Sequence, residues 1–444
     1  MRLMWRKKQE SSVRLTRSES DDDTTWALKN AIATHGFPFK DEDMADDEIE
    51  QPPINRLVNT IIQAAIKERA SDIHIEPDKR NTRIRYRVDG ILHEIIVVPQ
   101  YIQEPLIARL REIMGLPSES TALPQSGLIT FQFLETDYRL RVHLLPTQYG
   151  EKIVLHICKQ VSALLGLSKS GMTPETQGMF EEALIQSGGL IVFAGHTGSG
   201  RTTTQFNALN RMNTIERTSF VIGQRLEYEL SGVAFVQVDP KAGSTYEEAI
   251  AAVRYESPSI VMLDQIPDVN VWRAALDLAH SGTIVLASVC ANDSVAALIR
   301  LRDMGISSSV LASSVSGVLA QRLVRRVCPR CKEDYEEDAV NLRRFGFLVT
   351  NTEQKVSLVR GRGCEQCRNT GYLGRVGVFD FLHKSFDSVE ALLNYDGLPL
   401  RKKLLQSRWK TFSDDLVIKL TSHVTTPEEA LRVFSPDYGG DLLG

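Results

Sequence analysis

The sequence of 444 residues contains no run of about eighteen apolar residues, so no membrane span is expected from it. Its first residues, Met1 to Lys8, lack the apolar core of a signal peptide, which predicts a cytoplasmic protein. The charge is also low, with a formal net value of −4, and this gives no general reason to expect nucleic-acid binding. With 42% apolar and 24% charged residues, the chain is typical of globular proteins, and its length predicts two or three domains.

Cysteine is scarce, and four of the six cysteines form two Cys-x-x-Cys pairs: Cys328 with Cys331, and Cys364 with Cys367. In a reducing compartment this spacing favours metal over disulfides. Four thiolates from two such loops form a closed tetrahedral site suited to structural zinc. The alternative is four free buried cysteines. The two remaining cysteines, at 158 and 290, are predicted to be small buried apolar residues.

A glycine-rich segment follows the apolar run from Leu190 to Ala194, which predicts a buried strand. A helix is predicted over 202–212. Strand, glycine loop and helix together are typical of a phosphate-binding loop, because glycines turn backbone N–H groups inward and the helix N-terminus adds positive potential. The segment fits G-x-x-x-x-G-K-[ST] except that Arg201 replaces the lysine. An ordinary glycine turn is the alternative. The predicted nucleotide-binding residues are Gly195, Thr197, Gly198, Ser199, Gly200, Arg201, Thr202 and Thr203.

The loop belongs to a region, 161–327, in which predicted strands alternate with helices, and this predicts an α/β domain with a largely parallel sheet. The expected strands are 189–194, 218–222, 233–238, 259–264 and 283–289. The fourth ends in Asp264-Gln265, where nucleotide hydrolases bind Mg²⁺ water and orient the attacking water. Asp264 is suited to the first task. Gln265 can hydrogen-bond water, but it cannot accept a proton as a carboxylate can.

Ahead of this region, residues 52–160 predict a small α+β domain, with a helix from Ile54 to Ala65 and several strands. Arginines alternate with apolar residues along two of these strands. They form either a solvated strand face or a surface directed at phosphate. The candidates for the second role are Arg85, Arg87, Arg139 and Arg141.

The remaining segments complete the predicted domain organisation. Residues 1–51 contain acidic runs and are expected to be a disordered or shortened N-terminal region. Residues 328–382 carry the four cysteines, and 383–444 are predicted to be helical. The last helix opens at a predicted capping box, Thr426-Pro427-Glu428-Glu429.

The chain resembles the secretion and pilus-assembly ATPases of type II secretion and type IV pilus systems, the GspE/PilB group, over about residues 52–434. The resemblance rests on several segments besides the phosphate loop and the cysteine pairs: Ala70-Ser71-Asp72-Ile73-His74-Ile75-Glu76-Pro77, Arg85-Tyr86-Arg87-Val88-Asp89-Gly90, Leu145-Pro146-Thr147, Gly150-Glu151-Lys152, Asn292-Asp293, Gln321-Arg322-Leu323-Val324-Arg325, Gly371-Tyr372-Leu373-Gly374-Arg375-Val376-Gly377 and Thr425-Thr426-Pro427-Glu428-Glu429.

This resemblance implies a RecA-like P-loop core that binds ATP and Mg²⁺, and zinc at the four cysteines. It also implies a hexameric ring in which arginines of the small domain lie over the nucleotide of a neighbouring subunit. The ring is expected to dock on the cytoplasmic side of an inner-membrane platform protein, so the chain would be peripheral to the membrane through its partners, without a nucleic-acid partner. The cysteine pairs are similar to those of assembly members, whose N-terminal domain is expected to be shortened or absent here.

The sequence departs from the family's pattern at five sites. The loop lysine is Arg201, the acidic pair is Gly223-Gln224, the Walker B glutamate is Gln265, the two box histidines are Thr283 and Cys290, and an arginine of the small domain is His156. Arginine is larger than lysine and planar, and losing a carboxylate that orients water costs about 10²–10⁴-fold in rate. Hydrolysis is therefore expected to be weak or lost. The candidate catalytic residues are Asp264, Gln265 and Glu227.

Two functions from different classes remain open. One is an active motor ATPase that drives pilus or pseudopilus assembly with unusual residues. The other is a catalytically silent ring subunit with a structural or regulatory role, which still binds nucleotide. A third possibility is the motor of a conjugative or DNA-uptake pilus.

Overall fold

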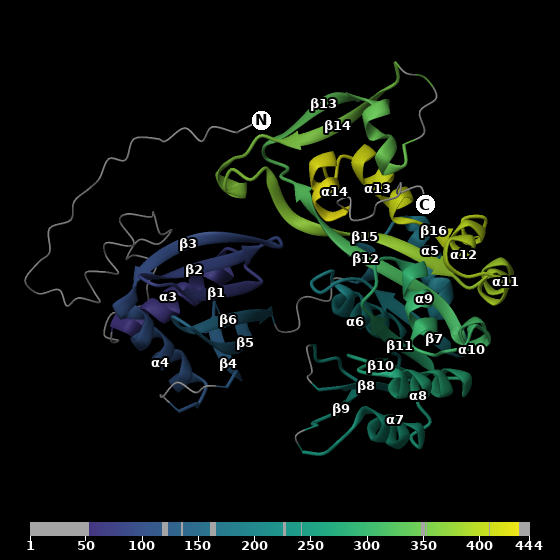
Figure 1. Ribbon diagram of the computed structural model, residues 1–444, viewed down its shortest axis with the longest axis horizontal. Coiled ribbons are helices and arrows are strands. Elements are labelled where there is room, and N and C mark those ends of the chain that lie inside the picture. Colours follow the sequence, from purple (N-terminus) through teal and green to yellow (C-terminus); the bar gives the residue numbers. More distant parts are fainter. Residues whose placement is uncertain are drawn as a thin grey trace, which may run out of the picture. The chain divides into compact units, whose positions relative to one another are not determined.

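The computed structural model describes residues 53–434, apart from 118–122, 135, 160–165, 225–227, 241, 348–350, 352 and 408. The predicted N-terminal region 1–51, the end of the chain after residue 434 and Glu227 lie outside the described residues. Contacts between Cα atoms divide the chain between residues 160 and 161 into two compact units, which are described separately (Figure 1).

The first unit is a six-stranded antiparallel sheet, as far as the described residues show, in the order β3-β2-β1-β6-β5-β4. Two helices, α3 and α4, contribute their apolar side chains to the same core as the sheet. The bounds are α3 (Pro53–Lys67), β1 (Asp72–Pro77), β2 (Asn81–Val88), β3 (Ile91–Pro99), α4 (Gln103–Ile113), β4 (Gln125–Phe133), β5 (Thr136–Thr147) and β6 (Gly150–Lys159).

Alternation along the strands gives this sheet one apolar and one charged face. Ile73, Ile75 and Ile84 are almost fully buried in the core. Their neighbours, among them Asp72, Glu76 and the arginines of β2, therefore lie on the opposite face. The turn between β2 and β3 has positive φ at both Asp89 (49°) and Gly90 (85°), as a tight hairpin requires.

The second unit is built on a mixed sheet of eight described strands, in the order β16-β15-β12-β7-β11-β10-β8-β9. The strands from β12 to β9 run parallel to one another, β15 runs antiparallel to β12, and β16 runs antiparallel to β15. The fold class is thus α/β with mixed sheets. The strand bounds are β7 (Gly189–Ala194), β8 (Ser219–Gly223), β9 (Val233–Gln237), β10 (Ile260–Leu263), β11 (Ile284–Val289), β12 (Val315–Val327), β15 (Tyr372–His383) and β16 (Trp409–Lys410).

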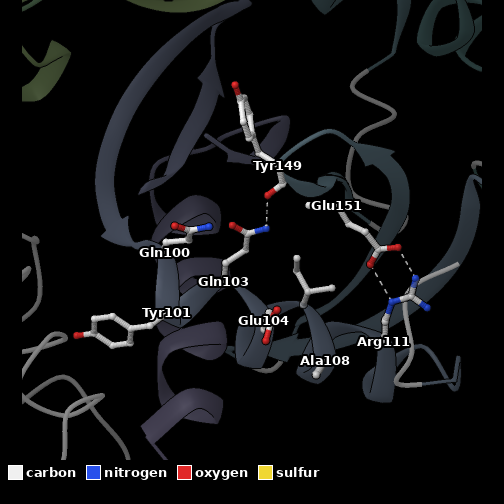
Figure 2. Close-up of a pocket in the computed structure, with 10 residues that line it drawn as sticks. Gln100, Tyr101, Gln103, Glu104, Ala108, Arg111, Tyr149 and Glu151 are labelled. Atoms are coloured by element: carbon white, nitrogen blue, oxygen red, sulfur yellow. Dashed lines mark hydrogen bonds and ion pairs between the residues drawn. The ribbon is translucent and has the colours of Figure 1, made fainter. Parts of the chain in front are cut away.

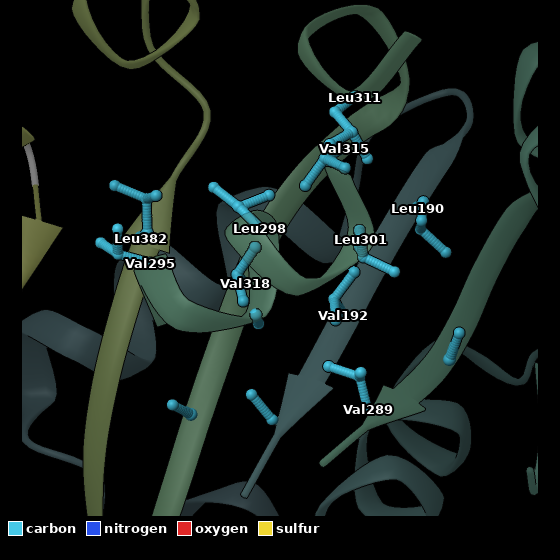
Figure 3. Close-up of a cluster of buried hydrophobic side chains, with 14 of the residues drawn as sticks. Leu190, Val192, Val289, Val295, Leu298, Leu301, Leu311, Val315, Val318 and Leu382 are labelled. Carbon is cyan, nitrogen blue, oxygen red and sulfur yellow. The ribbon is translucent and has the colours of Figure 1, made fainter. Parts of the chain in front are cut away.

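Helices cover both faces of this sheet, because its central strands are apolar on both sides. In β7, Leu190 and Val192 pack in one cluster and Ile191 and Phe193 in another. Figure 3 shows the first cluster, in which side chains of α9 meet the sheet. The helix bounds are α5 (Pro174–Leu184), α6 (Arg201–Met212), α7 (Tyr246–Arg254), α8 (Val269–His280), α9 (Ser294–Asp303), α10 (Ser308–Ser314), α11 (Phe386–Asn394), α12 (Gly397–Leu404), α13 (Phe412–Thr421) and α14 (Pro427–Phe434).

The long strands β12 and β15 run from the sheet to a small lobe at the cysteines (Figure 1). This lobe contains the antiparallel hairpin of β13 (Lys332–Asp338) and β14 (Lys355–Gly361). Residues 383–444 were predicted to be helical, and the described residues from 384 to 434 are mainly so. The short strand β16 is the exception, and it pairs with β15.

Candidate functional site

The predicted phosphate loop connects β7 to α6 at the carboxyl edge of the parallel strands. Its three glycines have positive φ: 150° at Gly195, 78° at Gly198 and 88° at Gly200. At Gly195 a Cβ atom would also lie 2.6 Å from the carbonyl oxygen of Gln321. Ser199 is buried, and its Oγ has no hydrogen-bond partner among the described residues. Glycine is thus required at both ends of the loop, whose tip, from His196 to Gly198, is exposed.

Arg201, at the lysine position of the loop, folds against β11. Its Nη1 donates to the carbonyl oxygen of Val289 at 2.6 Å, and its Nη2 lies 3.7 Å from Sγ of Cys290. The same carbonyl oxygen accepts from the backbone N–H of Gly195 at 3.3 Å. The arginine cation is therefore engaged with the neighbouring strand.

Two residues further along α6, the Thr203 hydroxyl shares a hydrogen bond with the Tyr228 hydroxyl.

Asp264 follows β10 and lies beside the end of β8. Its Oδ1 accepts from the Tyr246 hydroxyl at 2.5 Å, and its Oδ2 accepts from the backbone N–H of Gln224 at 3.0 Å. A Cβ atom at Gly223 would lie 2.5 Å from this carboxylate. Burial, and then the hydrogen bond to Asp264, raise the pKa of Tyr246, so its hydroxyl keeps the proton that it donates. Asp264 therefore links the end of β10 to the end of β8 through Oδ2 and to the start of α7 through Oδ1.

Two further residues of the predicted site that the structure describes at this edge carry an amide and not a carboxylate. Gln265 and Gln224 are both exposed. Sequence reasoning missed Tyr246, although it opens α7 directly after the cap residue Thr245. It also missed any role for Gln321, a buried polar residue within an apolar stretch of β12.

The four cysteines come together, with all four Sγ atoms within 4.8 Å of one another. The Sγ–Sγ distances are 3.8 Å for Cys328–Cys364, 3.8 Å for Cys331–Cys367 and 3.7 Å for Cys364–Cys367. A tetrahedron of sulfurs with Zn–S bonds of about 2.3 Å has edges of about 3.8 Å. The arrangement therefore fits zinc.

Backbone N–H groups around the cluster point at its sulfurs. Cys331 Sγ accepts from Gly363 at 3.3 Å, and Cys367 Sγ accepts from Cys364 at 3.2 Å and from Gly371 at 3.3 Å. Such donors stabilise thiolates, the form that binds metal.

The remaining two cysteines correct the sequence prediction, since neither is fully buried. Cys158 is half-buried and Cys290 is exposed. Apolar neighbours in sequence predicted burial. However, Cys158 lies opposite Arg139, on the charged face of its sheet, and Cys290 follows the last residue of β11.

The arginine candidates of the first unit share the charged face of its sheet. Arg85 Nη2 lies 2.5 Å from Glu76 Oε2, and Arg87 Nε lies 3.1 Å from Asp72 Oδ2. On β5, Arg141 pairs in register with His156, whose Nδ1 is hydrogen-bonded to Oδ1 of Asp72. Arg139 lies on the same face of β5, opposite Cys158. The register thus aligns arginines of β2 and β5 with carboxylates of β1 between them.

Burial acts differently on the acids and the histidine of this face. It raises the pKa of Asp72, but hydrogen bonds from His156 and Ser71 outweigh it, so the net shift is downward. Glu76 shows the same balance, with Lys152 and Arg85 lowering its pKa. His74 lies between these two acids on β1. Burial and the charge of Arg87 lower its pKa, and neither ring nitrogen has a hydrogen-bond partner among the described residues.

An open cavity of about 780 Å³ lies elsewhere in the first unit, between α4 and the turn from β5 to β6 (Figure 2). Its floor holds the fully buried Arg111, whose guanidinium pairs with both oxygens of Glu151. Gln103 donates to the carbonyl oxygen of Tyr149 at 2.9 Å. A Cβ atom at Gly150 would lie 1.8 Å from the Gln103 amide nitrogen. The Gly-Glu-Lys segment therefore has a structural role here.

Comparison with known proteins gives consistent matches. The family described as Type II/IV secretion system protein matches residues 47–432. The Vibrio cholerae protein named type II secretion system ATPase E is 32% identical over 395 residues, which cover 89% of this chain and 78% of that protein. The Thermus thermophilus type IV pilus assembly ATPase PilB is 32% identical over 385 residues, covering 86% of this chain and 43% of that protein.

Solved structures agree at the level of fold. The Legionella pneumophila ATPase DotB has a TM-score of 0.63 at 16% identity, over 86% of this chain and 95% of that one. No helix in the described part of the chain is long and apolar enough to span a membrane.

Proposed function

Because the chain belongs to the family of type II/IV secretion system proteins, we propose that it is a ring-forming nucleotide-binding protein of a type II secretion or type IV pilus machine. It supports pilus or pseudopilus assembly, and its hydrolysis of ATP is weak or lost. One observation carries this proposal: the loop keeps its glycine geometry, while Arg201 is engaged with Val289.

Nucleotide binding is supported by the backbone of the loop. Gly195, Gly198 and Gly200 let the N–H groups face a phosphate, and α6 begins directly behind them. Thr202 supplies the hydroxyl that holds Mg²⁺ in loops of this pattern. Relatives named ATPases match over most of this chain, so ATP with Mg²⁺ is the proposed ligand.

Weak hydrolysis is supported by the residues at the ends of β8 and β10. Gly223, Gln224 and Gln265 leave these positions without a carboxylate to organise water. Asp264 has both oxygens in hydrogen bonds to Tyr246 and Gln224. An active motor would need Asp264 to leave these partners, or Glu227 to replace it.

The proposed assembly is a hexameric ring with the second unit, including a RecA-like core over 161–327, at each nucleotide site. Arg85, Arg87, Arg139 and Arg141 of a neighbouring subunit are the proposed phosphate contacts. For this, Arg85 and Arg87 must exchange Glu76 and Asp72 for the phosphates. The proposed location is the cytoplasmic face of the inner membrane, on a platform protein. Light scattering that finds only monomer at micromolar concentration, with and without ATP, contradicts the ring.

ATP binding and ATP turnover, measured on the same purified oligomer, test the functional proposal. Binding with turnover near background supports a silent ring subunit. Turnover of about 1 s⁻¹ or faster that is abolished by Thr202→Ala identifies an active motor instead. A pull-down with the platform protein completes the test. Partner binding that survives Gly198→Ala places the partner surface outside the nucleotide cleft.

A further inference from the structure

Gln321 lies on β12 level with the start of the phosphate loop. The strand runs parallel to β7, with Ala320 paired to Ala194, so Gln321 is level with Gly195. Its side chain is only 4% exposed. The residues that precede and follow it on the same face are Leu319 and Leu323, so it is a buried polar group in an apolar row. Burying an amide in such a place costs stability unless hydrogen bonds compensate.

Three contacts connect this residue to the loop and to the helix behind it. The carbonyl oxygen of Gln321 lies 2.6 Å from the position that a Cβ atom on Gly195 would occupy. Its Nε2 lies 2.7 Å from the corresponding position on Gly200. Its Oε1 accepts from Oγ1 of Thr204, in the first turn of α6, at 2.6 Å. One residue therefore contacts the loop at its first and last glycine.

The buried Thr204 hydroxyl donates to Oε1 of Gln321 and also lies 3.3 Å from the carbonyl oxygen of Gly200. In this arrangement the amide nitrogen of Gln321 is the atom that faces Gly200. The Thr204 backbone N–H also donates to the carbonyl oxygen of Gly200 at 3.1 Å. Gly200 is thus hydrogen-bonded to the helix and in close contact with the Gln321 amide.

The strand that carries Gln321 is itself anchored. The adjacent Arg322 donates from Nη1 to the carbonyl oxygen of Val433 at 2.7 Å, and its guanidinium lies over the rings of Phe434 and Phe412. Gln321 pairs in register with Phe379 of β15 on the side away from β7. The amide therefore contacts the loop from a fixed support.

We propose that Gln321 is a positioning residue for the phosphate loop, which sets the direction of the loop N–H groups through Gly195, Gly200 and Thr204. The inference rests on the proposed function, because it assumes that the loop binds the phosphates of a nucleotide. Gln321 acts through the loop and does not itself contact the ligand. A loop that must be ordered on binding loses affinity, and about 1.4 kcal/mol of ordering corresponds to tenfold.

The test compares the full-length protein with Gln321→Met and Thr204→Val, each of which removes one end of the buried hydrogen bond at nearly constant volume. The affinity for ATP with Mg²⁺ is measured by calorimetry beside the melting temperature. The matched control is Thr425→Val, because the Thr425 hydroxyl donates to the Arg325 carbonyl oxygen of the same strand at 2.9 Å, away from the loop.

We expect Gln321→Met and Thr204→Val each to weaken ATP binding about tenfold, and the double variant to be no weaker than the worse single variant. The control should lose stability and keep its affinity. If Gln321→Met binds ATP like the wild type while its melting temperature falls, the inference is wrong.

If the wild type binds no ATP, the proposed nucleotide binding fails, and amide hydrogen exchange decides the inference separately. Faster exchange at residues 195–204 in Gln321→Met than in Thr425→Val supports a positioning role. Equal exchange in the two variants overturns it.

Discussion

Arg201 and Gly195 donate to one and the same acceptor, the carbonyl oxygen of Val289, at 2.6 Å and 3.3 Å. Gly195 is the first residue of the phosphate loop and Arg201 the first of α6. A carbonyl oxygen has two lone pairs, and both are used here. The two ends of the loop are therefore held at the end of β11, and the cation at the lysine position forms part of that closure.

Replacing Arg201 by lysine should strengthen nucleotide binding. Lysine has no planar fork to hold both Val289 and Cys290, and a flexible point charge can turn to the phosphates. We expect Arg201→Lys to bind ATP about tenfold more tightly, measured by calorimetry with Mg²⁺, with little change in turnover. Arg300→Lys is the control, since Arg300 donates to the Cys290 carbonyl oxygen, just beyond the loop contacts. Unchanged or weaker binding by Arg201→Lys contradicts the role given to Arg201.

We expect ATP hydrolysis to rise only when carboxylates are introduced at positions 224 and 265. We expect the triple variant Arg201→Lys, Gln224→Asp and Gln265→Glu to turn over ATP at least about 10²-fold faster than the wild type. Gly223 stays unchanged, because a side chain there would meet Asp264. The matched control carries Gln265→Asn in place of Gln265→Glu and should stay near background. Equal rates in the two triple variants would show that residue 265 takes no part.

The strand, glycine loop and helix from β7 to α6 were predictable because their signal is local: an apolar strand, closely spaced glycines and a helix follow one another in the sequence. The contact of Arg201 with Val289 was not, since 88 residues separate the two. Likewise, alternation indicated an arginine face on β2. That Glu76 and Asp72 hold these arginines depends on the register of β1, which no local pattern reveals.

The fold was predicted best where strands are uniformly apolar, as in β7, β10 and β11. The strand β12 was not predicted, because Gln321 and Arg325 interrupt its apolar pattern. The side chains that hydrogen-bond to these two residues lie on α6 and α14, far away in the sequence. The predicted capping box at Thr426 is only half present. Thr426 Oγ1 accepts from the Glu429 N–H at 3.2 Å, but the Glu429 carboxylate pairs with Arg325 and Arg432.

The cysteine cluster should contain zinc. Protein purified without chelator should carry about one zinc per chain by elemental mass spectrometry. Cys364→Ser should lose the metal and lower the melting temperature by roughly 5 °C or more. The controls Cys290→Ser and Cys158→Ser, both outside the cluster, should keep it. A zinc content near zero, with four thiols that titrate in the native protein, would refute this prediction.

The buried Asp380 should make stability depend on pH. Burial and the nearby Asp293 carboxylate raise the pKa of Asp380 to about 7. In the unfolded chain the pKa returns to its ordinary value, 3.8. Between these two pKa values the folded state binds one proton more than the unfolded chain. The stability that this proton contributes is complete below pH 3.8 and is lost as the pH rises through about 7. We expect the free energy of unfolding to fall by about 4 kcal/mol from pH 4 to pH 8 on this account.

Asp380→Asn isolates this effect, because the amide keeps an oxygen to accept from Trp409 Nε1, 2.9 Å away, but does not titrate. Urea unfolding at several pH values measures it. The free energy of unfolding of Asp380→Asn, relative to that of the wild type, should increase from pH 4 to pH 8. The exposed Asp387→Asn is the control and should track the wild type. A difference that does not vary with pH would rule out titration of Asp380 in this range.

His74 should also report on pH, with the opposite sign. Its lowered pKa means that the unfolded chain takes up a proton first as the pH falls below about 6.5, so the folded state loses stability there. His74→Phe removes two buried ring nitrogens without partners. We expect the variant to unfold at a higher urea concentration, with the larger gain at pH 5.5 than at pH 8. A variant less stable than the wild type at both pH values contradicts this.

The strand order of the eight-stranded sheet makes its completion a late event in synthesis. The first unit has every described strand by residue 159 and can fold while the ribosome is still adding the rest. In the second unit, β7 lacks one of its neighbouring strands until β12 has been synthesised. In the same way β12 lacks its neighbour β15, whose own partner β16 ends at Lys410. Until then an apolar strand edge stays open to other nascent chains. The second unit is therefore more exposed to edge-to-edge association during its synthesis than the first unit, whose described strands are complete at Lys159.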